Sequence, residues 1–199
     1  MAELVADSTV RKSAVTSGLI LGVVSSVLSI LSFYFTTTMT TSMWLIIFSP
    51  LIFSIIIPIV IAIFLILDLR KKIGGFWSFK QATTGTFIMF IISSIVSFLL
   101  VSLLFAKVIE PNMIDKSRDS MVNAVTAMME KTSQPQESVD KAIADINKKF
   151  DEQRDTGAGK MVMGLGIMVI ISFILALIFG AIFKKEPPRY IVQDTDPTV

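Results

Sequence analysis

The carboxylates in the polar segment 107–160 are the side chains of this sequence best suited to chemistry. Asp140, Asp145, Asp151 and Glu152 offer oxygen atoms of the kind that bind hard cations or pair for proton transfer. Their spacing, however, is typical of the solvated face of a helix, where acids and bases alternate along one side. We therefore expect these carboxylates to face water and to hold no metal ion.

Other reactive groups are missing from the sequence. The chain has no cysteine and no histidine, which excludes disulfides, thiolate metal sites, cysteine nucleophiles and imidazole bases. Serines in the apolar segments have no lysine or carboxylate within those segments to activate them. No phosphate-binding loop or nucleotide fingerprint is present. We expect a protein that is not an enzyme and that uses no cofactor.

One short motif near the end of the chain has a known binding mechanism. Residues 187–190 read Pro-Pro-Arg-Tyr, the proline–tyrosine signature that WW domains bind in an aromatic groove. Matches of four residues arise often by chance. We interpret this stretch as part of a disordered or loosely attached tail.

Apolar segments dominate the sequence and indicate a membrane protein. Hydrophobic residues make up 53% of the chain and charged residues only 17%, against about 25% charged in soluble domains. Uncharged runs at 14–35, 43–67, 85–106 and 161–183 are long enough to cross a bilayer. We predict an all-α integral membrane protein with four transmembrane helices and an extracytoplasmic helical hairpin between the third and fourth. The lipid bilayer is the expected partner, and a net charge of +2 does not favour nucleic acid.

Basic residues predict how the chain is oriented. Four spans place both termini on one side, which collects Arg11, Lys12, the basic segment 68–84, Lys184 and Lys185. Basic residues in short connections remain cytoplasmic. We therefore predict cytoplasmic tails at 1–13 and 184–199, spans within 14–106 and at 161–183, a cytoplasmic loop at 68–84, and an extracytoplasmic segment at 107–160.

The segment 107–160 has the periodicity of two amphipathic helices. Each carries one apolar stripe at helical spacing on an otherwise polar rod. The two stripes most simply bury each other in an antiparallel hairpin. A methionine-rich stripe is also suited to binding different partners, because methionine side chains adapt their shape. The possible partner surface, for a protein or a second copy, consists of Met121, Val125, Met129, Ile143 and Phe150.

Small residues recur at every fourth position in the first and last spans, a pattern that lets helix backbones approach closely in lipid. Such patterns also occur by chance in membrane helices. The predicted helix-packing residues are Gly18, Gly22 and Ser26 in the first span, and Gly164, Ser172, Ala176 and Gly180 in the last. Ser93, Ser94 and Ser97 give the third span a small polar face of its own.

Prolines and aromatic residues mark two further features. Pro50 and Pro58 lie in the second span, and each removes a backbone donor and bends the helix. They are either kinks that shape the bundle or a hinge in a transporter. Phe76, Trp77 and Phe79 precede the third span and are of the kind that rest at the level of lipid headgroups.

Several short motifs resemble those of one known family. They are GLILGVVSSVLSIL in the first span, Gly75-x-x-Ser78-Phe79-Lys80-x-Ala82 before the third, Glu110-Pro111 after it, and Lys-Lys-x-Pro after the last. With the order of elements, they resemble the small four-span bacterial membrane proteins grouped as domain of unknown function 4199. The resemblance implies a bacterial cytoplasmic membrane and supplies no activity and no catalytic residue.

Two functions are therefore expected from different classes. The first is a non-enzymatic accessory or scaffold protein that presents the hairpin to a partner outside the cytoplasm. The alternative is a small transporter or pore for an uncharged or lipid-like solute, with the bent second span as its gate. The uncharged spans favour the first, because ion-coupled pathways usually contain buried ionisable groups.

Overall fold

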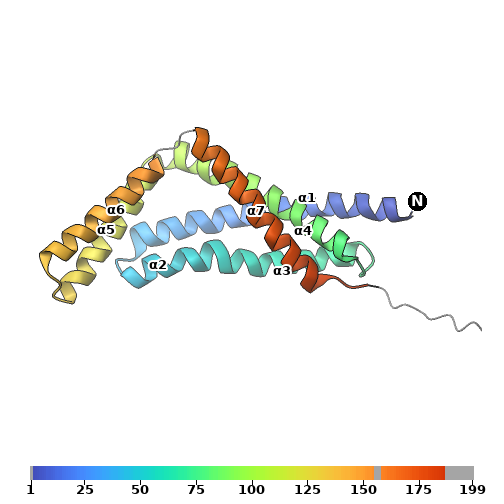
Figure 1. Cartoon of the computed structure of the whole chain (residues 1–199), viewed down its shortest axis with the longest axis horizontal. Helices are drawn as coiled ribbons and strands as arrows, with labels where there is room; N and C mark the ends of the chain where they lie inside the picture. The colour runs from blue at the N-terminus through green and yellow to red at the C-terminus, as the bar shows by residue number, and fades with distance from the viewer. Residues whose placement is uncertain (1, 155–157, 187–199) are drawn as a thin grey trace, which may run out of the picture.

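The computed structural model describes residues 2–154 and 158–186, which are almost entirely helical. The motif at 187–190 lies outside the described residues. Figure 1 shows the helices, which follow one another as α1 (Ala2–Tyr34), η1 (Phe35–Met39), α2 (Met43–Leu51), η2 (Ile52–Ile56), α3 (Ile57–Lys72), α4 (Phe79–Ser97), η3 (Phe98–Ile109), α5 (Met113–Lys131), α6 (Gln136–Arg154) and α7 (Ala158–Phe183). The three η segments are π-helical turns continuous with a neighbouring α-helix.

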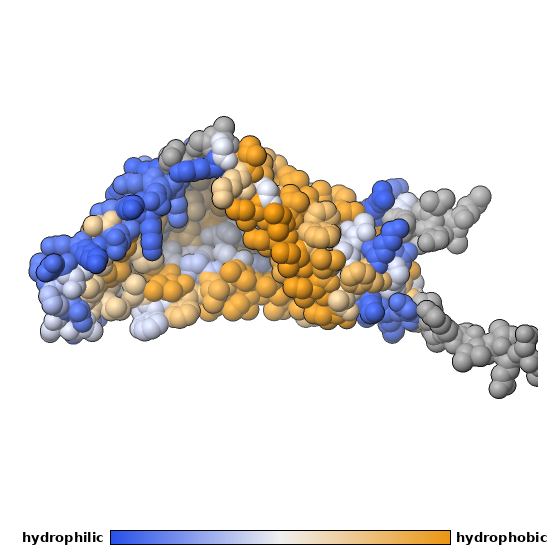
Figure 2. Space-filling model, in the orientation of Figure 1, coloured by the Kyte–Doolittle hydropathy of each residue, from blue (hydrophilic) through white to orange (hydrophobic). Residues whose placement is uncertain are grey.

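Four helical stretches of the described chain are long and apolar enough to cross a membrane, and they span Ser8–Met39, Met43–Lys72, Phe79–Ile109 and Val162–Phe183. They contain the four uncharged runs of the sequence and extend a few residues beyond them. Figure 2 shows the apolar surface of these helices between two polar ends. The prediction of an all-helical chain with four apolar spans is confirmed, and it indicates a multi-pass membrane protein.

The long helices pack around α4. α1 lies along α4 over most of its length, α7 crosses the other side of α4 obliquely, and α3 packs on α1 (Figure 1). The beginning of α1, the α3–α4 turn and the end of α7 lie at one end of the molecule. The basic residues of 11–12, 70–72, 80 and 184–185 are therefore gathered at that end, and the α1–α2 connection lies at the other.

Prolines shape the second span. The π-helical turn η2 lies between Pro50 and Pro58. A proline has no N–H to donate and its ring clashes with the carbonyl one turn earlier, so a wider turn accommodates the missing bonds. The second span is therefore one continuous rod that is locally widened between its prolines.

Trp77 closes the basic end of the bundle. Its backbone N–H donates to the Lys185 carbonyl at 2.9 Å, and its indole Nε1 donates to the Phe183 carbonyl at 2.7 Å. The side chain is 2% exposed and belongs to the buried cluster formed by α1, α3, α4 and α7. The expectation that this tryptophan rests among headgroups is wrong, because the end of α7 folds back over it. Phe76 and Phe79 remain exposed.

α5 and α6 occupy the polar segment between the third and fourth apolar stretches. They run antiparallel and contact each other (Figure 1). The turn between them contains Ser133 at φ 51°, a left-handed conformation. α5 also contacts α2 and η1, so the pair leans against the connection between the first two spans.

Candidate functional site

The candidate site lies where α5 meets the connection between the first two spans. On one side, the chain leaves η1 and is extended at Thr40 and Ser42 before α2 begins. The threonines of η1 satisfy the carbonyls at the end of the first span, since the hydroxyls of Thr36, Thr37 and Thr38 donate to carbonyls one turn earlier at 2.6–3.0 Å. The connection therefore needs no partner for its hydroxyl groups and can present its surface to α5.

α5 supplies the other side of this junction. Ala124 and Val125 are buried, and Ala124 is only 1% exposed. Small side chains let the helix approach closely, while the Thr132 hydroxyl donates to the carbonyls of Met128 and Met129 at 3.1 Å and ends the helix. The turn after α5 is therefore set by local hydrogen bonds, and its last helical turn faces the connection.

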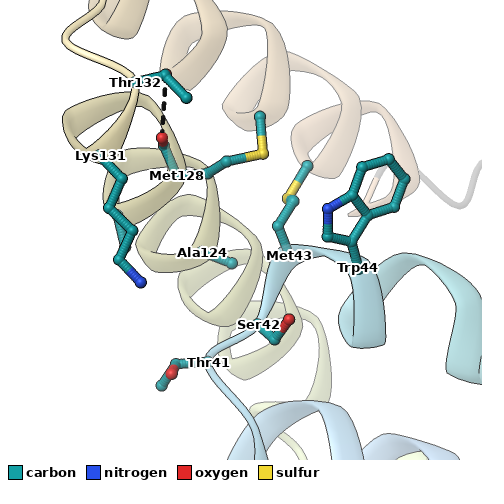
Figure 3. Close-up of a pocket in the computed structure, with 9 residues that line it drawn as sticks. Thr41, Ser42, Met43, Trp44, Ala124, Met128, Lys131 and Thr132 are labelled. Carbon is teal, nitrogen blue, oxygen red and sulfur yellow. Dashed lines mark hydrogen bonds between the residues drawn. The ribbon is translucent and has the colours of Figure 1, made fainter.

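A pocket of about 390 Å³ lies between these two surfaces. Figure 3 shows Met128 reaching from α5 toward Met43, with Trp44 beyond it and Lys131 pointing away from them. Trp44 is 66% exposed and Met128 is 40% exposed. We call this pocket the α5 junction, and it is lined by Thr41, Ser42, Met43, Trp44, Ala124, Ala127, Met128, Lys131 and Thr132.

The α5 junction is suited to binding an apolar group beside a positive charge. Its rim consists of two thioethers and an indole, which adapt to different shapes. Lys131 is the one ionisable side chain that lines it. Within residues 2–154 and 158–186, no three acidic side chains lie close enough together to hold a metal ion. The arrangement therefore supports recognition of another molecule.

The five residues predicted as a partner surface are withdrawn from solvent. Val125 is buried, and Met121, Met129, Ile143 and Phe150 are half-buried. Met128, Trp44 and Lys131, which line the α5 junction, were not selected from the sequence. Met128 belongs to the same helical stripe and Trp44 precedes an apolar run, so both carried a signal, but nothing in the sequence brings the two together.

The predicted helix-packing residues divide into two groups. A Cβ atom at Gly18 would lie 2.7 Å from the Met89 carbonyl oxygen, and one at Gly22 would lie 2.7 Å from the Val96 Cβ, so both glycines face α4 at close range. Ser26 is buried beside them and donates to the Gly22 carbonyl at 2.7 Å. On α7, Ser172, Ala176 and Gly180 are buried, and Gly180 faces Thr83 of α4. Gly164 has open space around it.

Ion pairs hold α5 and α6 together at the end where they join the spans. Arg154 at the end of α6 pairs with Asp115 in the first turn of α5, and Arg118 lies 3.4 Å from the same carboxylate. These groups are partly exposed, and isolated exposed pairs contribute about 0–1 kcal/mol. Their main effect is on geometry, because they fix the end of α6 over the start of α5.

A second pocket lies among the spans themselves. It has a volume of about 330 Å³ and is bounded by side chains from all four apolar stretches. Pro58 and Phe90 lie on its wall, together with the hydroxyl-bearing Ser25, Ser54 and Ser93. The lining contains no ionisable group, so the pocket is suited to an uncharged apolar molecule.

Comparison with known proteins assigns a family to most of the chain. A family model described as "Protein of unknown function (DUF4199)" matches residues 16–185. No curated protein and no solved structure matches the chain. The match spans all four apolar stretches together with α5 and α6.

Proposed function

Because the chain belongs to the DUF4199 family, whose function is unknown, we propose its role from its geometry. We propose a non-enzymatic multi-pass protein of the bacterial cytoplasmic membrane that presents a helical hairpin, α5–α6, to a partner protein outside the cytoplasm. Both termini and the 68–84 loop are cytoplasmic, and residues 107–160 are extracytoplasmic. The basic residues gathered at one end of the bundle support this orientation.

The observation that carries the proposal is the second attachment of α5. The hairpin is joined to the membrane helices through η3 and α7, and α5 also packs on α2 and η1. Two attachments restrict its height and tilt, which a scaffold requires. The apolar rim of Met43, Trp44 and Met128 stays exposed beside the second attachment. A partner that inserts an apolar side chain there would contact the hairpin and the spans at once.

Cysteine labelling tests the orientation. We expect Asp140→Cys to react in intact cells with a membrane-impermeant thiol reagent, and Lys71→Cys to react only after permeabilisation, because the two residues lie at opposite ends of the bundle. The chain has no native cysteine, so there is no background reaction. Labelling of Lys71→Cys alone in intact cells would show that the orientation is reversed.

Crosslinking then tests the partner. A thiol-reactive photo-crosslinker on Met128→Cys should form one adduct in native membranes, and Trp44→Ala in the same chain should remove it. Lys148→Cys, on the exposed polar face of α6, is the matched control and should form no such adduct. An adduct at twice the chain mass of 21.9 kDa would identify a second copy as the partner. An adduct insensitive to Trp44→Ala, or none, would contradict the proposal.

The pocket among the spans favours a second candidate function, a small transporter or pore for an uncharged or lipid-like solute. In that case, proteoliposomes should translocate a fluorescent short-chain phosphatidylcholine faster than empty liposomes. Ser93→Leu should abolish the excess rate, because Ser93 lies on the wall and is buried. Ser94→Leu, whose residue does not line the pocket, is the control. Equal rates with and without protein would remove this candidate.

A further inference from the structure

A third pocket lies where η3 leaves the apolar band and turns into α5. It has a volume of about 400 Å³, within the range of small-molecule sites. It is lined by Val101, Ser102, Ala106, Lys107, Pro111, Met113, Ile114 and Arg154. Neither the family match nor the proposed function assigns a role to this pocket.

Its lining combines apolar walls with two cations. Lys107 and Arg154 are the ionisable residues of the lining, and no acid lines the pocket. Lys107 is exposed and makes no ion pair with any residue that the structure describes. The walls toward the spans are formed by Val101, Ala106 and Ile114. The pocket therefore presents positive charge and apolar surface together.

Arg154 is positioned from outside the pocket. One of its terminal nitrogens pairs with Asp115, which does not line the pocket. A guanidinium has five N–H donors in a planar fork, so the pair with Asp115 leaves donors for a second acceptor. A planar donor group of this kind suits the oxygens of a phosphate, and a lysine ammonium binds the same group as a point charge.

The depth of the pocket selects the ligand. Lys107 lies two residues before the end of the third apolar stretch, Phe79–Ile109. Leu103, Leu104 and Val108 around it are exposed apolar residues that face lipid in a bilayer. A ligand bound here has its charged part at the level of the headgroups and its apolar part beside acyl chains. We propose that this pocket binds the phosphodiester headgroup of an anionic phospholipid, between Lys107 and Arg154.

Lipid binding to the intact chain in detergent tests this site. We expect native mass spectrometry to show tighter retention of phosphatidylglycerol than of phosphatidylcholine. A cation near an anionic lipid surface contributes about 1 kcal/mol, which is about a fivefold change in affinity. Lys107→Gln should therefore weaken phosphatidylglycerol binding about fivefold, and Lys107→Gln with Arg154→Gln roughly 30-fold. Phosphatidylcholine binding should not change.

The control is Lys131→Gln with Lys148→Gln, which removes the same charge from the same helix pair outside this pocket. It should retain phosphatidylglycerol as the wild type does. Equal losses in both double variants would show a general charge effect and overturn the proposal. So would a wild type that retains the two lipids equally.

Two further arms keep the result decisive. Because Arg154 pairs with Asp115, the double variant could disturb the α5–α6 pair, whereas Lys107 has no such partner and its single variant isolates binding. An unchanged affinity in Lys107→Gln would overturn the site. Free glycerol 3-phosphate should not displace phosphatidylglycerol, because it lacks the apolar part; displacement at equal concentration would show a soluble-anion site instead. None of these outcomes depends on a partner at the α5 junction.

Discussion

Replacing Trp77 with alanine should lower the free energy of unfolding by about 3–5 kcal/mol, as expected for a buried tryptophan. The indole lies in the cluster that joins α1, α3, α4 and α7. Gly85 of α4 shows how tight this region is, because an added Cβ would lie 3.1–3.5 Å from atoms of Val10, Leu69 and Trp77. Truncation would leave a cavity that three helices cannot close together.

The indole N–H contributes separately from the ring. It donates to the Phe183 carbonyl at 2.7 Å, at the end of α7. Trp77→Phe keeps an aromatic ring and removes this donor, so we expect it to cost less than alanine, about 1–3 kcal/mol for a carbonyl left without its main partner. The carbonyl retains a long contact of 3.5 Å to Arg70 Nη1. The difference between the two variants measures ring packing at this end of the bundle.

Thermal and denaturant unfolding in detergent measures both effects. Trp44→Ala is the matched control, since Trp44 is exposed and only stacks on Phe48, with ring centroids 5.7 Å apart. It should change the stability by less than about 1 kcal/mol. Equal losses for Trp77→Ala and Trp44→Ala would contradict the assignment of Trp77 to the core.

The second large effect is expected from Gly18→Ala and Gly22→Ala in one chain. The added methyl groups would lie 2.7 Å from the Met89 carbonyl oxygen and 2.7 Å from the Val96 Cβ, both on α4. Such overpacking costs about 1–3 kcal/mol per site. This exceeds the gain of about 1 kcal/mol that alanine has over glycine in a helix. We expect α1 to separate from α4 and the melting temperature to fall.

Separation would also break the polar contacts at this crossing. The Gly22 carbonyl accepts from the Ser97 hydroxyl of α4 at 3.2 Å as well as from Ser26. Losing the contact between helices would leave the hydroxyl of Ser97 without this acceptor in an apolar surrounding. The structural change should appear as loss of a Gly22→Cys to Ser97→Cys disulfide crosslink when Gly18→Ala is added.

Gly164→Ala with Gly166→Ala is the matched control for stability. It makes the same two changes in α7, where an added Cβ meets nothing within 4 Å. Helix propensity alone then acts, so this variant should be neutral or slightly more stable. If both double variants lower the melting temperature equally, close packing of α1 on α4 does not determine the stability of the bundle.

Much of the fold could be predicted from the sequence because membrane insertion depends on sums over residues. Hydrophobicity over a run of about 20 residues and the absence of charge mark a span wherever the run packs. The four apolar stretches follow from this. Basic residues likewise mark one end of each span, and the structure gathers them at one end of the bundle. The motifs in the spans and the Glu110-Pro111 pair also led to the family that the comparison shows.

The face that each span buries required the tertiary structure. In lipid, the surface that meets acyl chains is as apolar as the surface that meets a neighbouring helix, so hydrophobicity carries no directional signal. Small residues mark only the possibility of close contact. Gly22 and Gly164 occupy equivalent places in their two stripes, yet Gly22 lies against α4 and Gly164 faces open space. The oblique crossing of α7 over α4, which local sequence does not specify, separates these two outcomes.

The sites depended on tertiary structure for the same reason. Trp77 is buried by residues 183–185, more than a hundred positions away. Met128 meets Met43 and Trp44 because α5 leans on the first connection, and Lys107 meets Arg154 because α6 returns antiparallel to α5. By itself, the sequence determined a chain of four apolar spans with a polar helical insert, because these follow from each segment's own composition. Which side chains share a pocket was decided only by helix–helix packing, because that packing brings together segments that are distant in the chain.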